Sequence, residues 1–438
     1  MSPTRTAPHA PRPALARLRA PLQEIGLNTI AFGIIIAIQQ LLVFPGISRM
    51  TDAAGFSQVI LLITLSTIVV NVIGTEASKV ALIRSEAYRS KGLPWDAPRL
   101  VLLSTLVVGA LLALVAVVMQ VPWHLIVQYA AITVLGIVRS YATTPDKYDG
   151  KFGRVVRVHS IYAAGAVVGL LLIPWTGTAF TPFLLAEALS VIAVLVVRAR
   201  HRVVAETLRR TEEFTATSRS FIGLATIALL VNAVTYLDRL TITPLIGATA
   251  LAIYYSASAL SSSLSLITNP MGNAMLARLG RMDTARQGQM FAQGLLLAAP
   301  LVLVCWAGSF VIALGGLLVL YPTHFEAAVP LLAPVSLAAA FSNAVALLSP
   351  LLQRFLRVRR LLWFYLPYTL VYLAAITLFS TLWGLTGFAW ASALANGVLF
   401  GMYVVQIRLS SQHGRSPAGE PTPEAAPVPD PDPSSKRA

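Results

Sequence analysis

Charged residues are scarce in this sequence, and their scarcity excludes a soluble globular protein. Asp, Glu, Lys and Arg make up only 12% of the 438 residues, whereas 56% are hydrophobic, and the mean hydropathy is +0.72. A soluble domain has about 25% charged and about 45–50% apolar residues. Too few charges remain to cover a water-facing surface, so the composition indicates an integral membrane protein.

Residues typical of metal and redox sites are also rare. The single cysteine, Cys305, lies in an apolar run, so the chain can form no internal disulfide and no cysteine-based metal site. The six histidines show no metal-ligand spacing. No glycine-rich phosphate loop of the P-loop type is present. We therefore expect no metal, no cofactor and no nucleotide-hydrolysing motor in this chain.

Acidic residues are outnumbered, with 18 Asp and Glu against 33 Lys and Arg, which gives a net charge of +15. Such an excess can indicate nucleic-acid binding. Here, however, the basic residues lie between apolar runs and not on one soluble face. We interpret them through the positive-inside rule and attraction to anionic membrane lipid, and expect no nucleic-acid partner.

Twelve apolar runs are long enough to cross a bilayer, which needs about twenty residues per helix. None has the two-residue alternation of a barrel strand, and lipid excludes open sheet edges. The sequence therefore predicts an all-α integral membrane protein of about 12 transmembrane helices. The expected spans are 26–45, 57–79, 100–119, 123–143, 158–176, 181–198, 220–246, 250–274, 291–319, 328–352, 361–382 and 384–407.

The connections between these runs alternate in charge. One set is rich in Arg and Lys, and the other is short and nearly free of positive charge, with Arg49 as its clearest exception. Basic loops stay in the cytoplasm, so we expect cytoplasmic amino and carboxyl termini and a multi-pass protein of the cell membrane. The basic connections contain Arg84–Arg99, Lys147–Arg157, Arg198–Arg219, Arg278–Arg286 and Arg354–Arg360.

The longest polar break divides the spans into two groups of six. An even number in each group predicts a parallel repeat, with the halves related by an axis along the membrane normal. The two tails are too polar and too rich in proline to bury a core, so we expect them to be disordered. The expected parts are a basic tail at 1–25, bundles at 26–198 and 220–407, a cytoplasmic linker at 199–219 and a Pro-rich tail at 408–438.

Polar side chains recur at helical spacing in spans 1, 2, 7 and 8. Such faces either hold packed helices together or line a wet passage, and the sequence leaves both interpretations open. Their recurrence in corresponding spans of the two halves favours a passage. The candidate lining residues are Gln39, Asn71, Thr75, Asn232, Tyr236, Ser261 and Ser265.

Ionisable side chains within the spans are the strongest functional candidates. Asp238 and Arg239 are adjacent and point about 100° apart on a helix, so they do not simply neutralise each other. Glu187 is a second candidate carboxylate. Glu76 is a third, although with Lys79 it also fits a plain interfacial pair. For Arg139 the main interpretation is a side chain that extends to the membrane interface.

Several motifs resemble a known family. Tyr236-Leu237-Asp238-Arg239-Leu240, then Pro244-Leu245-Ile246-Gly247 and Ala252-Ile253-Tyr254-Tyr255, resemble the start of the second half of polysaccharide transporters. These are the oligosaccharide flippases of the multidrug/oligosaccharidyl-lipid/polysaccharide exporter superfamily. Ser48-Arg49 with Gly55-Phe56 resembles their first outer loop. Tyr148-Asp149-Gly150-Lys151-Phe152 resembles their connection between spans 4 and 5, whereas Ala252 replaces a usual glycine.

The resemblance implies a flippase that moves a polyprenyl-pyrophosphate-linked oligosaccharide across the cytoplasmic membrane by alternating access, for export of cell-surface polysaccharide. The polar passage would replace water around the sugar, and Arg239, Arg139 and Arg49 would bind the pyrophosphate. Coupling to a proton or sodium gradient would use Asp238, Glu187 or Glu76. Membrane proteins of polysaccharide assembly would be its partners.

Three alternatives stay open. One is a cation-coupled multidrug or metabolite exporter of the same fold, because the intramembrane charges do not decide between anionic and cationic substrates. Another is a non-transporting scaffold for cell-wall assembly. The third, a membrane enzyme acting on polyisoprenyl-linked sugars, is disfavoured because such enzymes build their site in a large outer loop and all outer loops expected here are short. We therefore expect the chain not to be an enzyme.

Overall fold

The computed structural model describes residues 26–413, apart from 27–29, 32, 119–121, 201–204, 267, 269–283 and 356–357. Within these ranges every regular element is a helix, and Trp95 and Glu206 form an isolated parallel bridge. The tails expected at 1–25 and 408–438 lie outside the described residues, except for the helical residues 408–413. The basic loop around Arg278 lies outside them as well.

The first half follows the expected order of spans. Span 2 is one long helical rod that includes a π-helical turn and continues beyond the bilayer to Ser90. The helices are η1 (Gln39–Val43), α2 (Phe44–Met50), α3 (Ala53–Val70), η2 (Asn71–Thr75), α4 (Glu76–Ser90), α5 (Ala97–Val118), α6 (Trp123–Ala142), α7 (Thr144–Tyr148), α8 (Phe152–Thr176) and α9 (Thr181–Arg200).

The second half contains two helix breaks, one within span 7 and one between spans 11 and 12. Tyr236 interrupts span 7, and α17 bends sharply at Trp383 and Gly384, where Gly384 has a φ of 58°. That backbone conformation suits glycine because a side chain would be strained there. The helices are α10 (Phe214–Thr235), α11 (Leu237–Leu245), α12 (Ala248–Ser261), η3 (Ser262–Leu264), α14 (Thr284–Leu320), η4 (Pro322–His324), α15 (Phe325–Ala328), η5 (Val329–Leu331), α16 (Leu332–Phe355) and α17 (Val358–His413).

The expected fold class is confirmed. Nine helical stretches in the described part of the chain are long and apolar enough to cross a membrane. The last of them, Pro367–Leu409, contains two expected spans separated by the bend at Gly384. The shorter apolar stretch Ala97–Ala110 and helix α12 correspond to the other two. The chain is therefore an all-α, multi-pass membrane protein with twelve spans in two halves.

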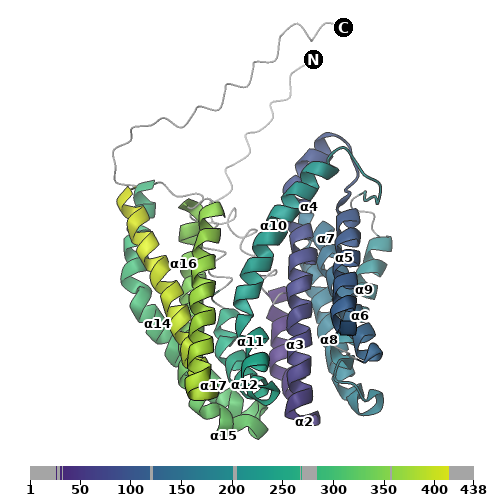
Figure 1. The fold of residues 1–438 in the computed structure, drawn as a ribbon. Helices are drawn as coiled ribbons and strands as arrows, with labels where there is room; N and C mark the ends of the chain where they lie inside the picture. Colours follow the sequence, from purple (N-terminus) through teal and green to yellow (C-terminus); the bar gives the residue numbers. More distant parts are fainter. Residues whose placement is uncertain are drawn as a thin grey trace, which may run out of the picture.

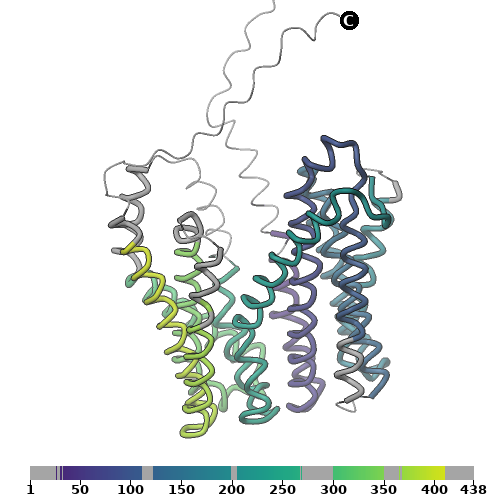
Figure 2. The backbone as a smooth tube through the Cα atoms, turned by 45° about the horizontal axis from the view of Figure 1, so that its top comes forward, coloured from purple at the N-terminus to yellow at the C-terminus, as the bar shows by residue number. Residues whose placement is uncertain are grey.

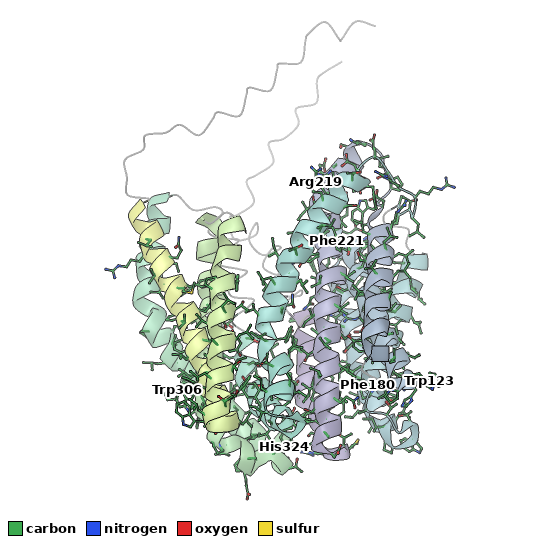
Figure 3. The ribbon with its side chains drawn as sticks, viewed as in Figure 1. Trp123, Phe180, Arg219, Phe221, Trp306 and His324 are labelled. Carbon is green, nitrogen blue, oxygen red and sulfur yellow. The ribbon has the colours of Figure 1, made fainter. Side chains whose placement is uncertain are left out.

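The two groups of helices approach each other at one end and diverge toward the other (Figures 1 and 2). Helices α2, α12 and α15 lie at the end where the groups meet. Figure 3 places Trp123, Phe180 and His324 toward this end and Arg219 at the opposite end. The positive-inside rule assigns the end with Arg219 to the cytoplasm. We call it the inner end, and the other the outer end.

Helices α8 and α9 pack with their backbones almost in contact. A Cβ atom at Gly165 would lie 2.9 Å from the Cα atom of Ala186 and 3.0 Å from the carbonyl oxygen of Leu185. Small residues allow this close approach, which membrane helices use because packing rather than hydrophobicity drives their association. The first half therefore contains at least one tightly fixed helix pair.

The inner end of α10 is fixed to the first half. The Trp95 amide donates to the Ala205 carbonyl at 2.8 Å, and the Thr207 amide donates to the Trp95 carbonyl at 2.8 Å. Asp96 accepts hydrogen bonds from Tyr88 and Thr211. Figure 1 shows α10 starting beside α4 and running diagonally to α11 and α12. Span 7 therefore contacts both halves.

The start of α10 is also held by charge. Glu213, just before this helix, forms ion pairs with Arg84 and with Lys91, the latter at 2.6 Å. The Tyr88 and Thr217 hydroxyls are hydrogen-bonded at 2.9 Å. The linker between the halves thus has a defined position on α4.

Candidate transport site

The first half buries a polar network around Arg139. The Arg139 guanidinium binds the Glu187 carboxylate with two hydrogen bonds, of 2.7 Å from Nε and 3.0 Å from Nη2. It also lies 5.0 Å from the ring centroid of Tyr162. Gln39 donates from Nε2 to the Tyr162 hydroxyl at 2.7 Å. Both charged groups are buried, so the interpretation of Arg139 as an interfacial side chain is wrong.

Two further residues of span 2 are paired locally. The Thr75 hydroxyl lies 3.1 Å from the Ser140 hydroxyl of α6. Glu76 is buried, and Lys79 binds it at 2.6 Å from a half-exposed position. Glu76 and Glu187 are therefore each neutralised by a basic side chain.

Asn71 and Asn232 form a direct contact between spans 2 and 7. The Asn71 amide donates a 2.9 Å hydrogen bond to Asn232 Oδ1, and Asn232 Nδ2 donates to the Ala228 carbonyl at 2.8 Å. Both side chains are partly buried. These two residues, expected on the passage, lie where the halves face each other.

Ser261 faces the interior of the second half instead. Its hydroxyl lies 3.1 Å from the Ser336 hydroxyl of α16 and also donates to the Ala257 carbonyl. Thr268 donates to Asn343 in the same way, at 2.8 Å. This part of the span 8 face therefore holds helices together. Ser265 is half-buried near the end of η3.

The helix break at Tyr236 places the adjacent charges of Asp238 and Arg239 in the first turn of α11. Helix α10 ends at Thr235 and α11 begins at Leu237. Because α11 starts there, the Arg239 amide is free of an intrahelical partner, and Asp238 Oδ1 accepts it at 2.8 Å. No ion pair joins Asp238 to a basic side chain in the part of the protein that the structure describes.

Arg239 lies between aromatic rings. Its guanidinium carbon is 5.2 Å from the Tyr236 ring centroid and 4.9 Å from the Tyr255 ring centroid. Its buried Nε has no hydrogen-bond partner. A guanidinium held by rings retains its positive charge for an anionic group, since cation–π contact does not neutralise it.

Arg49 occupies the outer end. It donates to the carbonyl of Val319 at 2.7 Å and to that of Leu320 at 3.4 Å, where α14 ends. Unpaired carbonyls at a helix C-terminus attract a cation. Because Arg49 belongs to the first half and α14 to the second, this bond joins the two halves. Arg49, Arg139 and Arg239 thus have three separate sets of partners and do not share one anion site.

Aromatic side chains form an outer seal between the halves, which the sequence analysis missed. The ring of Tyr255 lies 5.0 Å from that of Phe44 and 6.0 Å from that of Phe56. Phe56 also contacts Tyr321 and His324, at 6.3 and 6.2 Å. The Ser57 hydroxyl donates to the Ala248 carbonyl at 2.5 Å. The Gly55-Phe56 and Tyr254-Tyr255 pairs at outer span ends were the available signal.

A second feature missed from sequence is a pair of hydroxyl contacts in the second half. The Tyr372 hydroxyl lies 3.1 Å from that of Ser392, and the Tyr365 hydroxyl lies 3.3 Å from that of Tyr403. Tyr368 and Tyr372 stack at 5.9 Å. Tyr365, Tyr368 and Tyr372 have helical spacing on one face, which was the signal for this group.

Comparison with solved structures identifies the fold. The chain is similar to a structure titled "Crystal structure of MATE in the bent conformation", with a TM-score of 0.64, 13% identity, and coverage of 92% of this chain and 99% of that one. It is also similar to inward-facing and outward-facing structures of a multidrug resistance MATE family transporter of the MOP superfamily. The inward-facing match has a TM-score of 0.62, 13% identity and coverage of 93% and 100%. The outward-facing match has a TM-score of 0.64, 14% identity and coverage of 90% and 96%.

No protein-family model and no curated protein sequence matches the chain. At 13–14% identity, the structural likeness shows a shared fold alone.

Proposed function

We propose that this protein is a transporter that works by alternating access and exports a small molecule in exchange for a cation that binds at Asp238. The observation that carries this proposal is which of the three candidate carboxylates has a basic partner and which does not. Glu187 is neutralised by Arg139 and Glu76 by Lys79, whereas Asp238 has no such ion pair in the described part of the chain. A carboxylate without a fixed counter-ion is free to bind a cation.

The conformation supports the same proposal. Aromatic contacts and the Arg49 bond close the outer end, and α16 and α17 diverge from α3 and α4 toward the inner end (Figures 1 and 2). A structure closed outside and spread inside is one of the two states that alternating access requires. The fold likeness to multidrug transporters favours this cation-coupled exporter over the other candidates.

A second candidate is the flippase for a polyprenyl-pyrophosphate-linked oligosaccharide, together with its assembly partners. The observation that favours it is Arg239, a partly buried cation whose buried Nε has no hydrogen-bond partner. Such a group fits one phosphate of a pyrophosphate. The separation of Arg49 and Arg139 from this position weighs against it, because both are already bound elsewhere.

The test uses full-length protein in proteoliposomes, with ethidium as the probe and a proton gradient directed against it. We expect the gradient to drive ethidium accumulation, and Asp238→Asn to abolish it. The control is Asp52→Asn, because Asp52 caps α3 by accepting from the Gly55 amide at 2.9 Å and Asn caps a helix equally well. Native-level accumulation by Asp238→Asn would sink the proposal.

A second experiment with the same protein tests the flippase candidate. The same vesicles are loaded with a disaccharide on a short polyprenyl pyrophosphate, and exposure of the sugar on the far leaflet is measured with an added glycosidase. Exposure that depends on Arg239 and not on Asp238 would replace the exporter by the flippase.

A further inference from the structure

We propose that the inner corner between α5 and α10 binds the headgroup of one anionic phospholipid. The site is formed by Arg99 in the first turn of α5, Arg210 in the linker and Phe214 at the start of α10. It goes beyond the proposed function and does not depend on what the protein transports. It assigns a lipid ligand to the place where the linker docks on the first half.

Two guanidinium groups contact the same aromatic ring in this corner. The guanidinium carbon of Arg99 lies 5.1 Å from the centroid of the Phe214 ring, and that of Arg210 lies 5.7 Å from it. Arg210 Nη2 also donates to the Thr215 hydroxyl at 3.0 Å, which fixes its direction. A ring holds a guanidinium without neutralising it. Two like charges therefore lie close together, and an anion bound beside them would offset their repulsion.

The acidic side chains that flank these arginines in the sequence already have other partners. Neither Arg99 nor Arg210 forms an ion pair within the described ranges of the chain. The engaged acids are Glu213 with Arg84 and Lys91, Glu212 with Lys91, Glu206 with Arg198, and Asp96 with Tyr88 and Thr211. The two guanidiniums thus retain positive charge, and a phosphodiester matches a guanidinium in both charge and hydrogen-bonding geometry.

An exposed apolar surface begins on the bilayer side of Arg99. Leu103 and Leu106 follow Arg99 on the same face of α5, and both are exposed. Ile222, which is also exposed, lies two turns beyond Phe214 on α10. Hydrocarbon chains can cover such a surface, whereas a soluble phosphate would contact the arginines alone. Charge at one end and an apolar surface at the other are the two features that a phospholipid matches.

The height of the corner fits the cytoplasmic leaflet. Arg99 immediately precedes the apolar run expected at 100–119, so its side chain reaches the level of the headgroups. Figure 3 places Arg219, near the start of α10, at the inner end. Anionic headgroups of the cytoplasmic leaflet attract basic side chains at this level. The occupant we assign is therefore a lipid of that leaflet.

A headgroup bound here would connect the two halves. Arg99 belongs to α5 of the first half, whereas Arg210 directly precedes α10 of the second. One anion that contacts both arginines would hold the start of span 7 against the first half, next to the ion pair between Lys91 and Glu213. Anionic lipid should therefore stabilise the docked linker.

The test titrates phosphatidylglycerol into phosphatidylcholine nanodiscs that hold the full-length protein, and counts retained lipid by native mass spectrometry. We expect one phosphatidylglycerol to stay bound, and Arg99→Gln/Arg210→Gln to weaken its apparent affinity about tenfold or more, since both charge-assisted contacts are lost. The matched control is Arg89→Gln/Arg157→Gln, which removes the same charge from two exposed side chains of the basic connections. This control should bind phosphatidylglycerol like the native protein.

Three outcomes would overturn the proposal. Equal weakening in the control would assign the binding to general attraction between a basic protein and an anionic membrane. Native affinity in Arg99→Gln/Arg210→Gln would place the lipid elsewhere. Displacement of the lipid by excess glycerol 3-phosphate would show a phosphate site that gains nothing from the apolar surface.

Two further features keep the test decisive. If the double variant does not fold, Arg210→Gln alone decides, because Arg210 is exposed and its replacement leaves the core intact. Its affinity for phosphatidylglycerol should fall, and an unchanged affinity would overturn the site. The readout is lipid binding and not transport, so failure of the exporter proposal leaves this result unaffected.

Discussion

Asn71 and Asn232, 161 residues apart in the sequence, are joined by a 2.9 Å hydrogen bond between their side-chain amides. Asn71 opens the π-helical turn of span 2, and Asn232 lies in the last turn of α10. The contact links span 2 of the first half to span 7 of the second. In the proposed alternating-access cycle, this bond would be exchanged for another when the halves move.

We expect a double-mutant cycle of Asn71→Ala and Asn232→Ala to give a coupling energy of about 0.6–1 kcal/mol, as for other hydrogen bonds between membrane helices. The measurement is reversible unfolding in mixed detergent. Strict additivity of the two changes would show that the bond contributes nothing in solution.

Removing one charge of the Arg139–Glu187 ion pair should destabilise the protein far more than removing both charges. Arg139→Met leaves a buried carboxylate without its partner, and such a loss costs about 3–5 kcal/mol. The double variant Arg139→Met/Glu187→Leu removes both charges and should recover most of that loss. Unfolding free energies decide this, and a double variant less stable than both single variants would contradict it.

The outer seal can be locked by a disulfide. The Ser57 hydroxyl is 2.5 Å from the Ala248 carbonyl, so cysteines placed at 57 and 248, in a Cys305→Ser background, should be close enough to cross-link. We expect oxidation to stop ethidium transport and reduction to restore it. Transport at the native rate by the fully cross-linked protein would mean that this contact does not open during the cycle.

The linker contact at Glu213 should depend on pH. The hydrogen bond from Lys91, followed by that from Arg84, lowers the pKa of Glu213 below its ordinary value of 4.5. The same pair raises the pKa of Lys91 above its ordinary 10.5. A lowered carboxyl pKa stabilises the contact above pH 4.5, and this stabilisation is lost as pH falls through the lowered pKa. A raised amine pKa stabilises it below pH 10.5, and this is lost as pH rises through the raised value.

Protection of the first turn of α10 from amide exchange, corrected for the intrinsic pH dependence, should therefore be constant between these limits and fall outside them. Glu213→Gln should lower the plateau and remove the acid limb. High salt should weaken the contact as well, because Lys91 is half-exposed. An acid limb that persists in Glu213→Gln would assign it to another group.

The number and order of the spans could be predicted because each one requires a long apolar run. The expected boundary between 382 and 384 coincides with the bend at Trp383 and Gly384. Span 2 is longer than expected because Glu76–Ser90 continues the helix outside the apolar window. Helix α12 ends at Ser261, earlier than the apolar pattern extends, since a serine-rich 3-10 turn follows it.

Single buried charges could be predicted, but their partners could not. Asp238 and Arg239 were identifiable because charge is rare in a span. The partner of Arg139 lies 48 residues away, on a helix that only tertiary packing brings close. The hydroxyl pairs Tyr372–Ser392 and Tyr365–Tyr403 were missed for the same reason, because tyrosine is common in membrane helices and only the folded structure shows which hydroxyls meet.

The docking of the linker on α4 has a consequence for how the chain could be assembled. Ala205, Thr207, Thr211, Glu213 and Thr217 all bond to residues of the first half. A fragment that begins at Ala205 therefore retains these bonding residues, so it should bind a separate fragment that ends at Arg200. Two such fragments, coexpressed in one cell from separate messages, should associate and form the complete protein.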